Sequence, residues 1–281
     1  MSKFSPMKHK LIFFFIAVVS LTILSAHNLF IKLESFYLKP NTETLFYVYN
    51  GTFGESHSVL ARNRMLDVSI VNPGEKVIHP DTSNWYEKDN KTILPIKTGN
   101  EGTGVFGIST LPRINNYSPE VFEENMKHEG LLDVLEARKK SGEYSNPATK
   151  KYSKHVKAIF QIGNTLSNDY KTVLGYPIEL IPMNNPYSLK IGDELSMKLL
   201  VNGKPKADVT VYASFNDRFG YAKDDSPIDA FQIKTNSEGI VKIKITEAGH
   251  WYFRTVYLIK NLDQGADYIS NSAVVTFEVK K

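Results

Sequence analysis

Three histidines, His27, His57 and His155, are the residues of this sequence best suited to chemistry, and that chemistry is the binding of a transition-metal ion. If the chain is cleaved after Ala26, His27 presents an α-amine and an imidazole together, a bidentate nitrogen chelate that copper and nickel favour. His57 lies in a polar loop and His155 at the start of a strand, so either could approach His27 if the N-terminal strand folds beside them. A metal site needs such further ligands, and a partner that holds each ring.

Each of these histidines also has an ordinary interpretation. His27 could merely tolerate the cut, and cleavage after Ser25 would place the amine on Ala26 and remove the chelate. His57 could be a solvated loop residue, and His155 a hydrogen-bonded histidine at a sheet edge. The sequence contains no His-Glu-x-x-His or other close-set ligand pair. His79, His128 and His250 are typical of surface or packing positions.

The N-terminal segment predicts that the protein is exported. Lys3, Lys8 and Lys10 precede an apolar run over residues 11–24, which is typical of a signal peptide covering residues 1–26. A retained anchor is the alternative, but the run is shorter than the roughly 20 apolar residues that span a bilayer. We therefore expect a periplasmic or cell-envelope protein that is soluble after cleavage and meets the membrane only during export.

Composition narrows the class of protein. The chain has no cysteine, so its stability comes from buried surface and not from disulfides. The net charge is +4, from 34 basic and 30 acidic residues, and three of the lysines leave with the signal peptide. The mature chain is thus nearly neutral, which gives no support for nucleic-acid binding, since that requires a basic stripe.

Alternating apolar residues predict a mainly β fold of two β-sandwich-like domains. The first domain covers residues 27–170, with strands expected at 29–34, 44–49, 65–71, 92–96, 104–110 and 156–162. The second, residues 171–281, has the regularly spaced short strands of an immunoglobulin-like or transthyretin-like sandwich. Its strands are expected at 178–181, 194–200, 207–215, 230–235, 240–245, 250–257 and 273–279.

A helical insertion over about residues 118–142 interrupts the first domain. Ser118 and Pro119 are typical of an N-cap and a first helical position, and Glu120 suits the positive end of the helix dipole. Gly130 separates this helix from a second one that Gly142 ends. We expect the insertion to pack as a lid or side layer on the first sheet.

Enzyme signatures are missing from the sequence. It has no Gly-x-Ser-x-Gly elbow, no phosphate-binding loop and no cysteine nucleophile, so we expect no enzymatic activity. The pairs Trp85-Tyr86 and Trp251-Tyr252 could stack on a sugar or aromatic ligand, although aromatic residues in β-sandwiches more often belong to the core.

Five segments of the sequence are distinctive: Ala26–Phe30, Gly104–Arg113, Tyr152–Gln161, Asn202–Pro205 and Gly249–Arg254. Together they resemble the NikM-like family of exported proteins, domain of unknown function 4198. The resemblance implies β domains ending in a sandwich, an envelope location and an association with nickel or cobalt uptake. Where relatives often carry a histidine after the last segment, this chain has Thr255-Val256-Tyr257, so a metal site using that position would lack a ligand.

Together these observations favour a non-enzymatic envelope protein that binds or handles a transition-metal ion through His27, His57 and His155. The resemblance implies nickel or cobalt and a metal-uptake membrane component as partner, whereas the ligand chemistry also suits copper. The alternative is a metal-free adhesion, glycan-binding or partner-binding β-sandwich. A third hypothesis, an N-terminal-histidine copper oxidase, needs the same first ligand plus oxygen chemistry.

Overall fold

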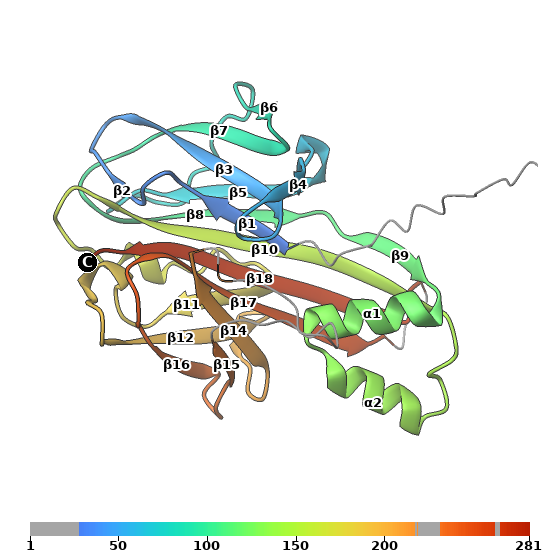
Figure 1. Cartoon of the computed structure of the whole chain (residues 1–281). Helices are drawn as coiled ribbons and strands as arrows, with labels where there is room; N and C mark the ends of the chain where they lie inside the picture. The colour runs from blue at the N-terminus through green and yellow to red at the C-terminus, as the bar shows by residue number, and fades with distance from the viewer. Residues whose placement is uncertain (1–27, 217, 219–230, 262–264) are drawn as a thin grey trace, which may run out of the picture.

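The computed structural model describes residues 28–216, 218, 231–261 and 265–281. The predicted signal peptide and His27 lie outside these residues. Two helices and three sheets make up the described part of the chain, which confirms the predicted mainly β fold class (Figure 1). No helix within these ranges is long and apolar enough to cross a membrane.

The first sheet lies at the top of Figure 1 and begins with the first described residue. Its order is β1 (Asn28–Lys32), β3 (Glu43–Gly51), β7 (Lys91–Lys97) and β6 (Tyr86–Lys88), with β4 (Ser56–Ser58) paired to the end of β3. β3 carries apolar side chains on both faces, as its sequence predicted, and its inner face holds Phe46 and Val48, both fully buried.

The second sheet has nine strands among the described residues and runs through the middle of the molecule. Its main path is β15 (Phe231–Lys234), β14 (Thr210–Phe215), β17 (Gly249–Lys260), β18 (Tyr268–Val279), β10 (Ala148–Ile162), β8 (Gly102–Thr110) and β5 (Met65–Val71). β2 (Tyr37–Leu38) and β9 (Arg113–Tyr117) also pair with β10. β10 and β18 are parallel neighbours, with Lys150 opposite Tyr268 and Ala158 opposite Thr276.

This sheet contains strands from both sides of the predicted boundary at residue 170. β5, β8, β9 and β10 come before the boundary, and β14, β15, β17 and β18 come after it. The division into residues 27–170 and 171–281 stays a prediction, and a continuous hydrogen-bonded sheet joins the two segments.

The third sheet packs on the part of the second sheet formed by β14, β17 and β18. It consists of β11 (Ile178–Pro182), β12 (Glu194–Val201) and β13 (Lys204–Pro205), with β16 (Ile240–Lys244) on the free side of β12. Short 3-10 turns at Arg62–Arg64, Asp169–Lys171 and Pro186–Ser188 complete the connections.

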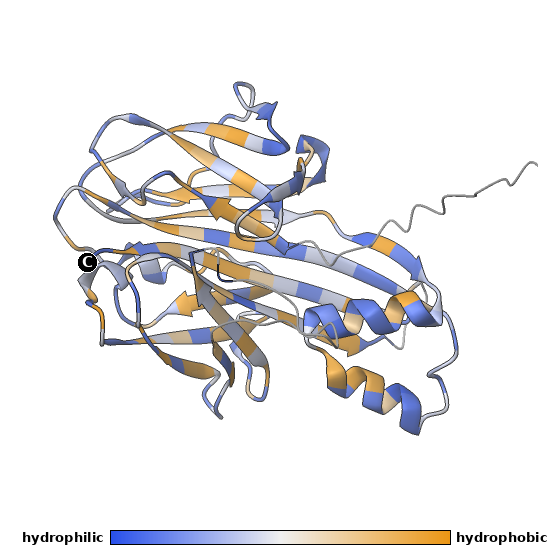
Figure 2. Cartoon of the chain, in the orientation of Figure 1, coloured by the Kyte–Doolittle hydropathy of each residue, from blue (hydrophilic) through white to orange (hydrophobic). Residues whose placement is uncertain are grey.

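Two sandwich-like cores result from this layering. One lies between the first sheet and the β5–β8–β10 part of the second, and contains Phe30, Phe46, Phe106 and Phe160. The other lies between the third sheet and β14, β17 and β18, and is built around Trp251. Figure 2 shows apolar residues concentrated in the strands. Each fully buried large side chain contributes roughly 1.5–3 kcal/mol, so these cores account for a cysteine-free fold.

The helical insertion forms as its sequence predicted. In α1 (Pro119–Glu129) the Ser118 side chain accepts a hydrogen bond from the Val121 N–H at 3.4 Å, and Gly130 ends the helix with φ 75°. α2 (Leu132–Lys140) follows it. Phe122, Met126 and Leu135 of the helices pack with Tyr117 and Tyr268. The insertion therefore covers one end of the second sheet as a side layer.

Candidate functional site

His57 and His155 occupy very different surroundings. His57 lies in β4 and is exposed, and its Nε2 lies 3.9 Å from Glu55 Oε2. His155 lies in β10 and is 2% exposed. Its Nδ1 is 3.0 Å from Ser109 Oγ, and its Nε2 is 3.2 Å from the Asn271 Oδ1 atom. Burial lowers the pKa of His155, which keeps the imidazole neutral.

Both ring nitrogens of His155 therefore already have hydrogen-bond partners, so a metal ion there would have to displace one of them. Within the described residues, no group of three or more His, Asp or Glu side chains is arranged to hold a metal ion. The ligand set of His27, His57 and His155 stays a prediction, since His27 lies outside the described ranges.

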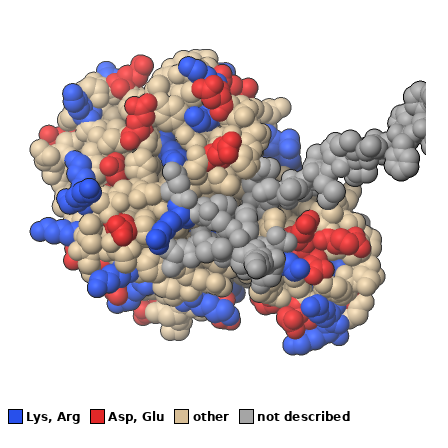
Figure 3. Space-filling view, viewed as in Figure 1, with Lys and Arg blue, Asp and Glu red and all other residues tan. Residues whose placement is uncertain are grey.

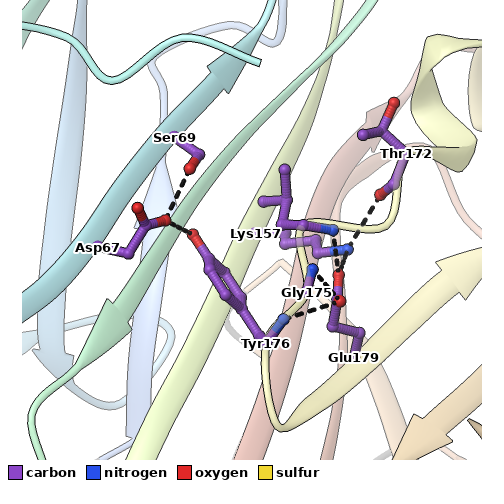
Figure 4. Close-up of polar contacts among 8 residues, drawn as sticks. Asp67, Ser69, Lys157, Thr172, Gly175, Tyr176 and Glu179 are labelled. Atoms are coloured by element: carbon purple, nitrogen blue, oxygen red, sulfur yellow. Dashed lines mark hydrogen bonds and ion pairs between the residues drawn. The ribbon is translucent and has the colours of Figure 1, made fainter. Parts of the chain in front are cut away.

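A different polar cluster forms around Asp67 in β5 (Figure 4). Asp67 and Ser69 are two residues apart in the strand and share a face, so Ser69 Oγ donates to Asp67 Oδ2 at 2.6 Å. The Tyr176 hydroxyl donates to the same oxygen at 2.8 Å. Burial, followed by this hydrogen bond, raises the pKa of Tyr176, so the phenol stays protonated and continues to donate.

His79 completes this cluster at the protein surface. The backbone of Ile78 exchanges two hydrogen bonds with Ile70 of β5, each 2.9 Å, which places His79 beside Asp67. His79 Nδ1 lies 3.0 Å from Asp67 Oδ1 and 2.9 Å from the Val68 carbonyl oxygen. Because both of these neighbours of Nδ1 are hydrogen-bond acceptors, Nδ1 carries the ring hydrogen when the imidazole is neutral. In that tautomer Nε2 has a lone pair that can accept a hydrogen bond.

The His79 ring lines a pocket of about 380 Å³, which we call the His79 pocket. Arg62, Met65 and Thr82 form part of its wall, and Trp85 is the aromatic residue within it. Trp85 is 2% exposed, and its Nε1–H has no hydrogen-bond partner in the structure. A buried donor of this kind is uncommon, since most buried polar groups are satisfied.

A buried ion pair holds Tyr176 in place behind the pocket. Lys157 of β10 pairs with Glu179 of β11, and their side chains are 4% and 1% exposed. Glu179 also accepts hydrogen bonds from the N–H groups of Leu174, Gly175 and Tyr176 at 2.9–3.0 Å. Gly175 has φ 81°, a conformation that suits glycine and lets consecutive N–H groups face one carboxylate. Figure 4 shows Tyr176 reaching from this carboxylate to Asp67.

The geometry of the cluster differs from that of a Ser-His-Asp triad. In a Ser-His-Asp triad the nucleophile faces one imidazole nitrogen and the carboxylate faces the other. Here Ser69 Oγ lies 3.4 Å from His79 Nδ1, the nitrogen that Asp67 already holds, and donates its own hydrogen to Asp67. Ser69 is therefore not activated, whereas Nε2 of His79 can accept a hydrogen bond or coordinate a ligand.

Only part of this site is indicated by the sequence. The sequence predicts His79 to be an ordinary surface residue, and its side chain is 68% exposed. The available signal was Asp67, the only charged residue in the strand Met65–Val71. Of the aromatic pairs, Trp251 and Tyr252 are fully buried core residues, Tyr86 is 42% exposed, and Trp85 belongs to the His79 pocket.

Charges elsewhere are mixed. Figure 3 shows basic and acidic side chains interspersed over the visible face, as expected for a chain with nearly balanced charge.

Comparison with known proteins identifies one family and distant likenesses among solved structures. A family model described as "Domain of unknown function (DUF4198)" matches residues 24–258. No curated protein matches the chain.

Among solved structures, the D0-D1 domain of intimin is 12% identical over 88% of this chain and 96% of its own, with a TM-score of 0.20. The adhesin InvE of Yersinia pseudotuberculosis is 12% identical over 89% of this chain and 60% of its own, with a TM-score of 0.22. An α-2-macroglobulin from Escherichia coli is 10% identical over 90% of this chain and 16% of its own, with a TM-score of 0.23. At such TM-scores these likenesses carry no argument about function.

Proposed function

This chain belongs to the DUF4198 family, a domain of unknown function, and from that premise we propose that it is an exported, non-enzymatic binding protein that takes a small polar ligand in the His79 pocket. The observation that carries the proposal is the fixed imidazole. Asp67 and Val68 hold Nδ1, so the ring presents Nε2 in one tautomer at an exposed pocket. A partner that fixes the tautomer and orientation of a histidine is typical of rings that bind ligands.

The composition of the pocket indicates the class of ligand. Nε2 of His79 accepts a hydrogen bond, and the guanidinium of Arg62 attracts an anionic group. Pro80 and Met65 add apolar surface. A small organic acid that carries a hydroxyl or amine donor matches this combination.

The test is to titrate mature protein with small hydroxy acids and amino acids and to follow the His79 ring and the Trp85 indole by ¹H–¹⁵N NMR. We expect saturable shifts at both residues, lost in His79→Ala and weakened in Asp67→Asn. His57→Ala is the matched control, and it should leave the shifts unchanged. Equal loss in both histidine variants, or shifts confined to other residues, would contradict the proposal.

A second candidate function is the handling of a transition-metal ion, nickel or cobalt as the family resemblance implies, or copper. One observation favours His57 as a ligand near the start of the mature chain. Asn28, the first described residue, is opposite Gly51 in the first sheet. The His57 ring packs on Gly51, since a Cβ atom there would lie 3.2 Å from His57 Cγ. The amine and imidazole of His27, the preceding residue, would supply the chelate.

Calorimetric titration with nickel, cobalt and copper tests this candidate on protein shown by mass spectrometry to begin at His27. Binding of about one ion per chain should disappear in a Met-extended form and in His57→Ala, and should persist in His79→Ala. If only His79→Ala abolishes metal binding, the metal site lies in the His79 pocket. If wild-type protein binds no metal ion, metal handling is refuted.

The setting of the protein is part of the same proposal. We propose a periplasmic or envelope location after removal of residues 1–26, and a membrane component of a metal-uptake system as partner if the metal candidate holds. If it fails, a metal-free adhesion, glycan-binding or partner-binding role remains, with Tyr86, which follows Trp85 in the sequence, as an exposed aromatic contact.

A further inference from the structure

A lysine, an asparagine and a glutamate meet where the helical insertion packs on the second sheet. Lys150 of β10 is 2% exposed, and its Nζ donates one hydrogen bond to Asn125 Oδ1 and another, at 2.8 Å, to Glu129 Oε1. Asn125 is 5% exposed. Asn125 and Glu129 are four residues apart in α1, so they share one face of the helix. The helix therefore presents an amide and a carboxylate together to one buried amine.

The surroundings of these three groups are apolar. The large buried side chains of the adjoining core are Tyr117, Phe122, Met126 and Tyr268. Lys150 Nζ lies 5.5 Å from the centre of the Tyr117 ring. Burial raises the pKa of Tyr117 to about 12, which shows that charge is disfavoured here. The Glu129 side chain is 15% exposed, and its buried Oε2 accepts no hydrogen bond from the described residues. Water is thus largely excluded from the amine, the amide and the carboxylate.

An amine, an amide and a carboxylate held in this way have the parts of an acyl transfer. Because Oδ1 is bonded to Cγ, its hydrogen bond with Nζ holds the nitrogen of Lys150 beside the carbonyl carbon of Asn125 and polarises the carbonyl. Glu129 lies within the reach that a general base needs, about 2.6–3.2 Å. Fixing the reactants in one place replaces a bimolecular encounter, which is worth an effective concentration of about 10⁵ M or more when the groups are well oriented.

We propose that Lys150 and Asn125 become joined by an amide bond between their side chains, with Glu129 transferring protons. Glu129 takes a proton from the Lys150 ammonium, and the freed lone pair of Nζ attacks Asn125 Cγ, so that the Nζ–Cγ bond forms. Glu129 passes that proton to Nδ2, the Cγ–Nδ2 bond breaks, and Nδ2 leaves as ammonia. The second proton lost from Nζ departs with the ammonia as ammonium. One amine and one primary amide thus give one secondary amide and one ammonium ion, with no change of oxidation state.

The bond ties α1 to β10 and closes a loop of chain between two residues that are 25 positions apart. α2 lies within that loop. A cross-link of this kind limits the freedom of the unfolded chain as a disulfide does, in a chain that has no cysteine. None of the three residues lines the His79 pocket, so the bond stands or fails independently of the proposed function.

The experiment is mass spectrometry of the purified mature protein, intact and after proteolysis. We expect the wild-type chain to weigh about 17 Da less than its sequence, the mass of one ammonia, and to yield a branched peptide that joins Asn125 to Lys150. Lys150→Met and Asn125→Ala should have the full sequence mass, and so should Glu129→Gln, which cannot take the proton. Lys151→Met is the matched control, because Lys151 is the exposed neighbour in the same strand, and it should keep the loss of mass.

A second readout does not depend on mass. Trypsin cleavage after Lys139 or Lys140, at the exposed end of α2, cuts inside the closed loop. The two parts of the wild-type chain should therefore stay together on a denaturing gel, whereas those of Lys150→Met should separate. A wild-type chain of full sequence mass that separates on cleavage would overturn the proposal and leave an ordinary ion pair. A loss of ammonia that persists in Lys150→Met would overturn it equally, because the loss would then arise elsewhere in the chain.

Discussion

Removing either partner of the buried Lys157–Glu179 pair should destabilise the protein, and the two removals should not be equal. Lys157→Met leaves Glu179 with the three backbone N–H donors of the 174–176 turn. Glu179→Leu leaves those three donors without an acceptor and also leaves the buried ammonium of Lys157 without its counter-charge. We therefore expect the glutamate substitution to cost more than the lysine substitution.

The magnitudes follow from the surroundings of each group. Breaking a buried pair usually costs 3–5 kcal/mol, and the three remaining donors keep Lys157→Met at the lower end, about 3 kcal/mol. An unsatisfied buried N–H costs about 1–3 kcal/mol. Of the three donors only the Tyr176 N–H is buried, and water can reach that of Gly175, so Glu179→Leu should exceed Lys157→Met by about 1–3 kcal/mol. Isosteric apolar replacement of a buried pair is often neutral. Here the double variant should remain destabilised, because the three donors still lack an acceptor.

Urea denaturation followed by tryptophan fluorescence measures these free energies of unfolding. Glu179→Gln is the variant to use if Glu179→Leu does not fold, since its amide oxygen keeps one acceptor for the turn. The reasoning is refuted if Lys157→Met costs as much as Glu179→Leu. It is equally refuted if the double variant is as stable as wild type, because the N–H groups of the turn would then not depend on Glu179.

Further predictions concern single buried groups. Burial lowers the pKa of Lys154 to about 8 in the folded state, below its unfolded value, so the folded state binds fewer protons. The free energy of unfolding should therefore rise by up to about 3 kcal/mol between pH 8 and pH 10. Urea titrations at several pH values should show this rise in wild type and not in Lys154→Met. His155→Ala should cost about 2–4 kcal/mol because it creates a cavity and leaves hydrogen-bond partners unsatisfied, and thermal unfolding checks it. Trp85→Phe should cost less than about 1 kcal/mol for its lost N–H, because Nε1 has no hydrogen-bond partner. Trp251→Phe should cost about 1 kcal/mol more, because its Nε1 donates to the Glu247 carbonyl oxygen at 2.9 Å. Chemical denaturation that finds the reverse order of the two costs would contradict this assignment.

Local elements could be predicted from the sequence because their signals are local. The strand expected at 44–49 is β3, Glu43–Gly51, and the strand expected at 194–200 is β12, Glu194–Val201. The cap at Ser118 and the end at Gly130 are confirmed in α1. Each depends on alternation or on a side chain within a few residues.

Long-range arrangement was not predictable in the same way. β10 starts at Ala148 and not near residue 156, because polar residues in its first half hide the alternation. One of them, Lys150, is 2% exposed and depends on Glu129 of α1. Likewise, no periodicity indicates the bridge between Ile70 and Ile78 that places His79 beside Asp67. The sequence could mark Asp67 as unusual, but its partner Tyr176 lies 109 residues further on.

The position of β18 has a consequence for the order of folding. This strand, Tyr268–Val279, is the last one described, yet it lies between β10 and β17 in the interior of the second sheet. During synthesis, the edge of β10 along Lys150–Ala158 therefore lacks its parallel partner until residues 268–276, more than 100 residues later, have been made. Parallel pairing of distant strands is slow, and an unpaired edge invites aggregation. The nascent chain consequently stays incompletely folded until β18 has been made, and in that state a chaperone can bind it.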